Sequence, residues 1–327
     1  MAGITIGIDV GGTTIAAGLV GPDGQVLEHV QAETHARGAG RALDTILDLL
    51  AQLQERARAR GVTLTGIGVG IPGIVDTERG TIGADVHHVP ELNGVALADE
   101  LRRPLGLPVY VDNDVNVLAL AEWRWGAGRG ARSLVLLALG TGVGGGIILD
   151  GRLHRGHAGF GGELGHVPID FDGPPCICGG HGCLKAYVSG TDIARRGSAR
   201  LGRPVSAAEV FQLAAAGDVA ADACVEEVCR ALGAGLGIVV NGLNPERVLL
   251  AGSVAKSLGP LEGRLRAALA RHSYEGARAS THLEILSLDK AATVRGGAAL
   301  VHYETGREAI GHHETYHDRE RRRTETS

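Results

Sequence analysis

The segment that decides the fold is Ile4-Thr5-Ile6-Gly7-Ile8-Asp9-Val10-Gly11-Gly12-Thr13-Thr14-Ile15-Ala16-Ala17-Gly18-Leu19-Val20. Its residue pattern predicts a strand over 4–8, a turn over 10–14 and a second strand over 15–20. A dinucleotide-binding glycine turn leads from a strand into a helix. Here a second strand follows the turn, so the turn is expected at the tip of a β-hairpin. Glycines there let backbone N–H groups approach phosphate oxygens, and the hydroxyl of Thr13 adds a donor.

The same pattern returns later in the chain. An apolar run over 134–139 leads into Gly140-Thr141-Gly142-Val143-Gly144-Gly145-Gly146, and a further strand is expected over 146–149. An ordinary glycine-rich hairpin would explain either loop alone. Their repetition favours two related lobes that face each other, each with a phosphate-type loop.

Three cysteines stand close together in Cys176-Ile177-Cys178-Gly179-Gly180-His181-Gly182-Cys183, and His166 precedes them by ten residues. One histidine and three cysteines form a ligand set of the kind that a structural Zn²⁺ takes. The alternative is three unrelated buried thiols, but packing alone does not explain such tight, glycine-flanked spacing. The remaining cysteines, Cys224 and Cys229, fall on an alanine-rich helical pattern and are expected to be buried thiols.

The segment Asp112-Asn113-Asp114-Val115-Asn116 lies between an apolar strand and an expected helix over 115–125. Acidic residues at such a place often only cap the helix. The alternative is that one aspartate is a general base that takes a proton from a hydroxyl nucleophile, as in phosphoryl transfer to an alcohol. Glu163 and His166 would then hydrogen-bond substrate hydroxyls, because a zinc-bound histidine keeps one ring nitrogen available.

The 327 residues suffice for two domains that share a substantial core. We expect a small N-terminal α/β lobe over 1–117, completed by a helix near 291–304, and a larger α/β lobe over 118–290 that carries the zinc motif. The charged residues over 305–327 predict a disordered tail. Further helices are expected over 42–60, 97–105, 192–201, 207–215, 219–242 and 261–271, and further strands over 25–30, 64–71, 109–111, 247–250 and 283–286.

Composition excludes several classes of function. The net charge of −5, with no large basic block before the tail, argues against a nucleic-acid partner. The N-terminus lacks the basic region and apolar run of a signal peptide, and no long apolar stretch predicts a membrane span. Five cysteines, three of them in the proposed metal site, fit a reducing cytoplasm.

In combination, these motifs resemble those of the ROK family (repressor, open reading frame, kinase) in the actin/hexokinase/Hsp70 superfamily. The resemblance covers roughly residues 3–304. It rests on Asp9-Val10-Gly11-Gly12-Thr13, Gly70-Ile71-Pro72-Gly73, Asn113-Asp114, the loop over 140–146, Gly162-Glu163-Leu164-Gly165-His166 and the cysteine cluster. It implies an α/β fold of the two-lobed, actin-like ATPase (ribonuclease H-like) type, with a cleft between the lobes and a structural zinc site.

The resemblance also implies roles for single residues. It makes Asp114 the catalytic base and puts Asp9 near Mg²⁺ and its waters. It implies that the phosphates of ATP are surrounded by Gly11, Gly12, Thr13, Thr14, Thr141 and Gly142, and that the adenosine lies near Gly252 and Ser253. It implies that the sugar is held by Gly73, His88, Asn113, Asp114, Glu163, His166 and Lys185. The structural Zn²⁺ would be held by His166, Cys176, Cys178 and Cys183 and would set the pocket wall through the histidine.

Three residues depart from the family pattern. Thr14 stands where the family usually has lysine, which removes one cationic phosphate contact, and His88 aligns with an asparagine of the sugar loop in many members. Lys185 stands where most members have a glutamate that binds sugar hydroxyls, whereas lysine only donates hydrogen bonds and carries a positive charge. Either the sugar differs from glucose, for example by an acidic group, or Lys185 points away and the pocket is rebuilt.

The leading expectation is an ATP-dependent kinase that phosphorylates the 6-hydroxyl of a hexose, with glucose as the substrate. The alternatives are a kinase for N-acetylhexosamine, mannose, fructose, allose, a modified or acidic sugar or a cyclitol, and a catalytically weak sugar-binding or regulatory protein. A sugar-responsive repressor would need a helix-turn-helix ahead of the first strand, and the sequence begins in that strand. The family also implies a homodimer or homotetramer, with no nucleic-acid or membrane partner.

Overall fold

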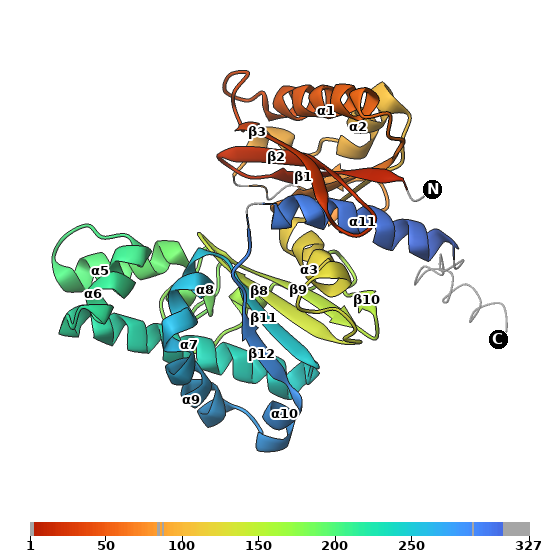
Figure 1. Ribbon diagram of the computed structural model, residues 1–327. Helices are drawn as coiled ribbons and strands as arrows, with labels where there is room; N and C mark the ends of the chain where they lie inside the picture. The colour runs from red at the N-terminus through yellow and green to blue at the C-terminus, as the bar shows by residue number, and fades with distance from the viewer. Residues whose placement is uncertain (1–2, 84–85, 87, 290, 310–327) are drawn as a thin grey trace, which may run out of the picture. The chain divides into compact units, whose positions relative to one another are not determined.

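The computed structural model describes residues 3–83, 86, 88–289 and 291–309 (Figure 1). The chain forms two compact units, one of Met1–Asp112 with Thr293–Ser327 and one of Asn113–Ala292. The tail expected over 305–327 lies outside the described residues from 310 onward, and its first residues continue the last helix to Ala309. Arginine, glutamate and alanine are good helix formers, which accounts for that continuation.

A five-stranded sheet in the order β3-β2-β1-β4-β7 forms the centre of the first unit. Its strands are β1 (Ile4–Val10), β2 (Thr14–Val20), β3 (Val26–Glu33), β4 (Leu64–Ile71) and β7 (Val109–Asn113). β1 pairs antiparallel with β2 and parallel with β4. The short strands β5 (Val75–Asp76) and β6 (Thr81–Ile82) pair as a separate hairpin, which precedes the 3₁₀ helix η1 (Pro90–Leu92).

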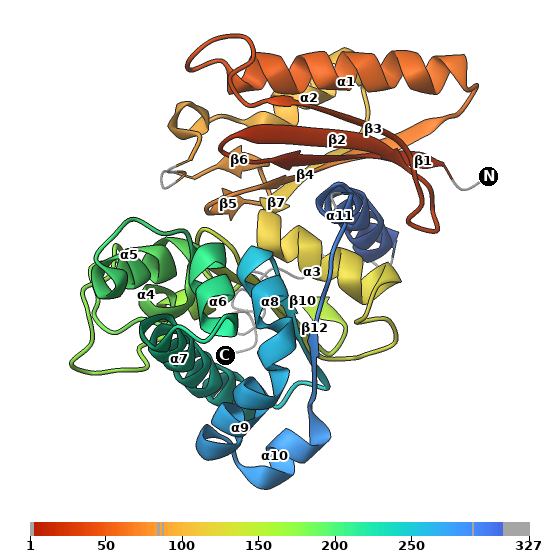
Figure 2. The ribbon, with the colours of Figure 1, turned by 60° about the vertical axis from the view of Figure 1, so that its left-hand side comes forward.

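Helices cover both faces of this sheet (Figure 2). α1 (Ala42–Ala59) lies on one face with its buried side chains, among them Ile46, Leu50 and Leu53, directed into the core. α2 (Leu97–Leu105) also contributes to this core. α11 (Ala292–Ala309) lies on the other face, where a side chain in place of Gly7 or Gly68 would collide with the helix backbone. These strand glycines therefore allow a helix to approach the sheet closely.

The second unit has a five-stranded sheet in the order β10-β9-β8-β11-β12. Its strands are β8 (Leu134–Leu139), β9 (Val143–Leu149), β10 (Arg152–Leu153), β11 (Arg247–Ala251) and β12 (His282–Ile285). Its helices are α3 (Asp114–Trp125), α4 (Lys185–Val188), α5 (Gly190–Leu201), α6 (Ala207–Ala215), α7 (Val219–Leu243), α8 (Ser253–Leu258), α9 (Glu262–His272) and α10 (Glu275–Ser280), with the 3₁₀ helices η2 (Leu164–His166) and η3 (Gly259–Leu261). The long helix α7 supplies much of the apolar core.

The two sheets have the same strand order. In each unit the first three strands form an antiparallel meander, and the fourth strand lies parallel to the first. This shared topology confirms the mixed α/β fold and the prediction that the two halves are related. Among the described residues, no helix combines the length and the apolar character needed to cross a membrane.

Candidate active site and metal centre

The first glycine turn lies at the tip of the β1–β2 hairpin, as the sequence predicts, but it is shorter than expected. The strands extend to Val10 and from Thr14, and the backbone N–H of Gly11 donates to the carbonyl of Thr14 over 3.0 Å. Thr34, buried and not singled out from the sequence, fixes the turn from outside, because its hydroxyl donates to the carbonyl of Gly11 over 2.6 Å. The side chains of Thr13 and Thr14 are exposed at the turn.

Three further residues expected in the site belong to this unit. His88 packs against Gly12, whose missing Cβ would lie 2.9 Å from that of the histidine. Gly73 follows the end of β4 in the left-handed region, with φ of 95°. Burial raises the pKa of the Asp9 carboxyl above its ordinary value, against an opposing hydrogen bond with Thr293. A carboxylate in such a place gains from a bound cation, which fits the Mg²⁺ role that the family resemblance implies.

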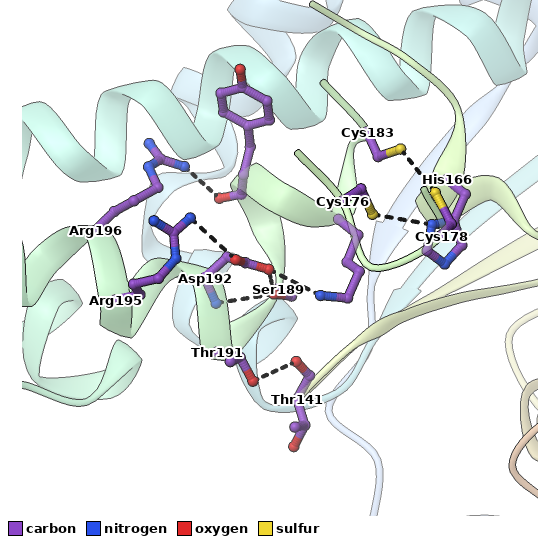
Figure 3. Close-up of polar contacts among 12 residues, drawn as sticks. Thr141, His166, Cys176, Cys178, Cys183, Ser189, Thr191, Asp192, Arg195 and Arg196 are labelled. Carbon is purple, nitrogen blue, oxygen red and sulfur yellow. Dashed lines mark hydrogen bonds and ion pairs between the residues drawn. The ribbon is translucent and has the colours of Figure 1, made fainter. Parts of the chain in front are cut away.

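The second glycine turn connects β8 and β9. The N–H of Gly140 donates to the carbonyl of Gly142 over 3.0 Å, and Thr141 and Gly142 are exposed. Two residues at the start of α5 hold the turn: the N–H of Gly190 donates to the carbonyl of Gly140 over 2.7 Å, and the hydroxyl of Thr191 donates to the carbonyl of Thr141 over 3.0 Å (Figure 3). The turn thus lies against a helix N-terminus, a place that favours anions.

The loop expected over 140–146 ends at Gly142, because β9 begins at Val143. The next three glycines serve packing rather than loop flexibility. A side chain at Gly144 or Gly146 would collide with Val115 or Ala119 of α3, and one at Gly145 would collide with the segment that carries Gly162. Because β9 has no side chains at these three positions, α3 and the segment around Glu163 can pack closely against it.

The start of α3 carries the candidate base. Asn113 is the N-cap, and its side-chain oxygen accepts from the backbone N–H groups of Val115 and Asn116 over 2.9 and 3.3 Å. The sequence analysis allowed for an aspartate as the cap of this helix, but the structure shows that the cap is Asn113. Asp114 is the first helical residue and half-buried, and its Oδ1 accepts from the N–H of Val115 over 2.8 Å. Asp114 therefore lies at the positive end of the α3 dipole.

Packing on β9 brings the acid and the sugar-binding candidates to neighbouring positions. Val115, next to Asp114, touches Gly144, while Gly162 and Leu164, on either side of Glu163, touch Gly145. Three residues further on, His166 ends η2, and its Nε2 lies 3.9 Å from Oε2 of Glu163. A carboxylate and an imidazole N–H side by side can accept from and donate to sugar hydroxyls.

The predicted metal ligands come together. The ligand atoms of His166, Cys176, Cys178 and Cys183 all lie within 4.8 Å of one another (Figure 3). Nδ1 of His166 is 3.4 Å from Sγ of Cys176, and the sulfurs of Cys178 and Cys183 are 3.7 Å apart. A tetrahedral Zn²⁺ with usual bond lengths places neighbouring ligand atoms roughly 3.4–3.8 Å apart. The site fits Zn²⁺, with Nδ1 of the histidine directed at the thiols.

Lys185 begins α4, two residues after the last cysteine of the cluster. Its ammonium donates to Oδ2 of Asp192 over 3.1 Å, and each of the two side chains is 15% exposed. Asp192 lies in the first turn of α5 and was not singled out from the sequence. Gly252 packs under the carbonyl of Leu139, and Ser253 follows it at the start of α8.

Comparisons with known proteins identify the family to which the chain belongs. The ROK family model matches residues 5–304. The chain is 33% identical to the glucokinase of Halalkalibacterium halodurans, over 90% of this chain and 94% of the relative. It is 32% identical to the N-acetyl-D-glucosamine kinase of Escherichia coli O9:H4 (strain HS), over 90% and 98%. A solved ROK family glucokinase from Streptomyces griseus, in complex with glucose and AMPPNP, superposes with a TM-score of 0.75 at 30% identity, over 93% of this chain and 100% of that chain.

The two sheets with the same strand order, the two glycine turns and the Cys/His cluster define a protein of the actin-like ATPase class. Within that class, the chain belongs to the ROK family.

Proposed function

We propose that this protein is an ATP-dependent kinase that transfers the γ-phosphoryl group of ATP to the 6-hydroxyl of a hexose, with glucose as the substrate. A sugar phosphotransferase follows from the relatives, of which two are sugar kinases at 32–33% identity over nearly the full length. The observation that carries the mechanism is the placement of Asp114, whose carboxylate begins α3 beside the β9 residues that also support Glu163.

In the proposed reaction, Asp114 accepts the proton of the 6-hydroxyl while that oxygen bonds to the γ-phosphorus. The bond from the γ-phosphorus to the bridging oxygen breaks, and ADP leaves with the electron pair. Asn113 orients the start of α3 by capping it, which holds the carboxylate of Asp114 in place. Catalysis of this kind rests mainly on positioning and on charge stabilisation.

The two glycine turns are the proposed phosphate contacts, through Gly11, Gly12 and Thr13 in one unit and Thr141 and Gly142 in the other. Mg²⁺, when bound, would neutralise charge on the phosphates, and the half-buried carboxylate of Asp9 is the proposed group beside it. The hydroxyl of the exposed Thr14 can donate to phosphate, although it supplies no charge. Gly252 and Ser253 are the proposed neighbours of the adenosine.

The geometry around the metal cluster supports the proposed sugar contacts in the second unit. Because Nδ1 of His166 faces the thiols, its Nε2 is the nitrogen that can donate to a sugar hydroxyl, next to the accepting carboxylate of Glu163. Asn113 is the third proposed contact in this unit. In the other unit we propose Gly73 and His88, of which His88 lies against the first glycine turn. We further propose that the protein is cytoplasmic and forms a homodimer or homotetramer. Sedimentation analysis tests the oligomeric state.

A panel of sugars tests the substrate. With ATP and Mg²⁺, we expect glucose to give the highest kcat/KM, ahead of N-acetylglucosamine, mannose, fructose, allose, acidic sugars and cyclitols. Added or missing polar groups in a hydrogen-bonding site commonly change kcat/KM by on the order of tenfold or more. A higher kcat/KM for another sugar would replace glucose as the substrate, and ADP formation with none of them would refute the kinase assignment in favour of a sugar-binding protein.

A further inference from the structure

The ion pair between Lys185 and Asp192 connects the metal cluster to α5, the helix that holds the second glycine turn. Lys185 follows Cys183 of the metal cluster with only Leu184 between them, and Leu184 is buried. The N–H of Leu184 also donates to the carbonyl of Val167 over 2.9 Å. The backbone from which the lysine extends is therefore fixed from both sides, by the cluster and by the core.

The other end of the ion pair is equally fixed. Ser189 is the N-cap of α5, and its Oγ accepts from the N–H of Asp192 over 3.1 Å. In return, the Ser189 hydroxyl donates to Oδ2 of Asp192 over 2.7 Å, and Arg195 donates to Oδ1 over 3.3 Å (Figure 3). Burial raises the pKa of the Asp192 carboxyl, but the hydrogen bonds from Ser189 and Lys185 outweigh burial and hold the pKa below its ordinary value. The carboxylate is thus charged, and Lys185 is the least exposed of its cationic partners.

The helix that Lys185 contacts holds the second glycine turn. Gly190 and Thr191, between the N-cap and Asp192, make the two hydrogen bonds to the carbonyls of Gly140 and Thr141. A shift of the N-terminal residues of α5 would therefore move the glycine turn over 140–142. Without the ammonium, a partly buried carboxylate would also oppose the approach of phosphate groups to this helix N-terminus.

We propose that Lys185 is a positioning residue that connects the metal cluster to the glycine turn over 140–142 and thereby sets the affinity for the nucleotide rather than the choice of sugar. This inference rests on the proposed kinase function. It differs from a direct role in sugar binding, because the ammonium of Lys185 is already engaged by a charged carboxylate that other hydrogen bonds hold in place.

Nucleotide binding without turnover tests the inference. We expect Lys185→Gln to weaken binding of Mg²⁺–AMPPNP roughly tenfold in calorimetric titration, since it removes one charge-assisted hydrogen bond. Asp192→Asn should weaken binding at least as much, because the carboxylate also accepts from Ser189 and Arg195. The KM for ATP should rise by a similar factor, while the KM for sugar stays within about twofold and the zinc content is unchanged. Lys185→Arg should restore the affinity, and the double variant should be no weaker than Asp192→Asn alone, because both single changes remove the ion pair between Lys185 and Asp192.

Lys185→Glu separates the two roles sharply. If Lys185 selects the sugar, glutamate at this position should improve the use of glucose, as the family resemblance implies. If it positions the turn, the change puts two carboxylates together and should weaken nucleotide binding more than Lys185→Gln does, without improving the use of glucose. Arg203→Gln, which removes the exposed ion pair of Arg203 with Glu209, is the control and should leave both affinities unchanged.

Three results would overturn the inference. One is wild-type affinity for the nucleotide in Lys185→Gln, and another is a change in sugar preference with nucleotide affinity intact. A third is loss of zinc from Lys185→Gln, because the effect would then run through the metal. Should Lys185→Gln fail to fold, Asp192→Asn, which keeps the shape of the side chain, decides the question. Absence of sugar phosphorylation by the unaltered protein would refute the proposed function instead.

Discussion

Replacement of Asp114 by asparagine is expected to lower kcat by roughly 10²–10⁴-fold, the usual contribution of a positioned general base. The folded state and the affinity for sugar should change little, because asparagine keeps the size of the side chain and an oxygen that can accept from the N–H of Val115. Steady-state kinetics with the preferred sugar, together with calorimetric titration of that sugar, measure both quantities.

Asp218→Asn is the matched control. Asp218 is the N-cap of α7 and accepts from the N–H of Ala221 over 2.9 Å, so it is also an acid at the start of a helix. Asparagine caps helices about as well as aspartate, and the control should keep full activity and nearly full stability. A kcat near the wild-type value in Asp114→Asn would mean that Asp114 also serves only the helix, and the proposed mechanism would be wrong.

Local sequence patterns predicted the elements that hold the site. The strand–turn–strand pattern placed both hairpins, because alternation and glycine turns act over a few residues. The metal ligands were also predictable, since three cysteines at short, glycine-flanked spacing with a nearby histidine are typical of a structural zinc site. At the start of α3 the sequence predicted a cap but allowed for an aspartate, whereas the structure assigns the cap to Asn113.

The errors arose where distant parts of the chain decide the local structure. Gly144 and Gly145 were expected in a loop because glycine is unfavourable in strands, yet they lie in β9, where neighbouring segments leave no room for side chains. Thr34 fixes the first glycine turn from 23 residues away, and the short helix α8 has too few residues to show a period. Such long-range contacts are absent from any local pattern.

Asp192, the partner of Lys185, could have been predicted only in part from the sequence. The sequence Ser189-Gly190-Thr191-Asp192 has the spacing of a capping box, with an acidic residue three positions after a serine, and this signal could have located the start of α5. It could not have shown that the lysine of the preceding helix reaches the same aspartate. That contact depends on the sharp turn between α4 and α5, at Ser189.

One Zn²⁺ per chain is expected from metal analysis of the purified protein, and Cys178→Ser should lose it. The thiolates of three cysteines and the Nδ1 of His166 are brought to tetrahedral spacing, and a serine hydroxyl is a poor substitute for a thiolate ligand. Without the ion, His166 would no longer be held with its Nε2 toward the sugar. We therefore expect kcat/KM for the sugar to fall roughly 10–100-fold, mainly through a higher KM.

The zinc should also stabilise the fold around it. Within the described residues from 167 to 184, the regular structure consists of two isolated bridges, Pro168 with Cys183 and Pro175 with His181, so the ion would be the main cross-link of the segment. Chelation should then lower the melting temperature of the wild-type protein and leave that of Cys178→Ser unchanged. Cys224→Ala, which removes a buried thiol of α7 outside the cluster, should keep the metal and respond to chelation as the wild type does. A metal-free wild-type protein with full activity would contradict the structural zinc.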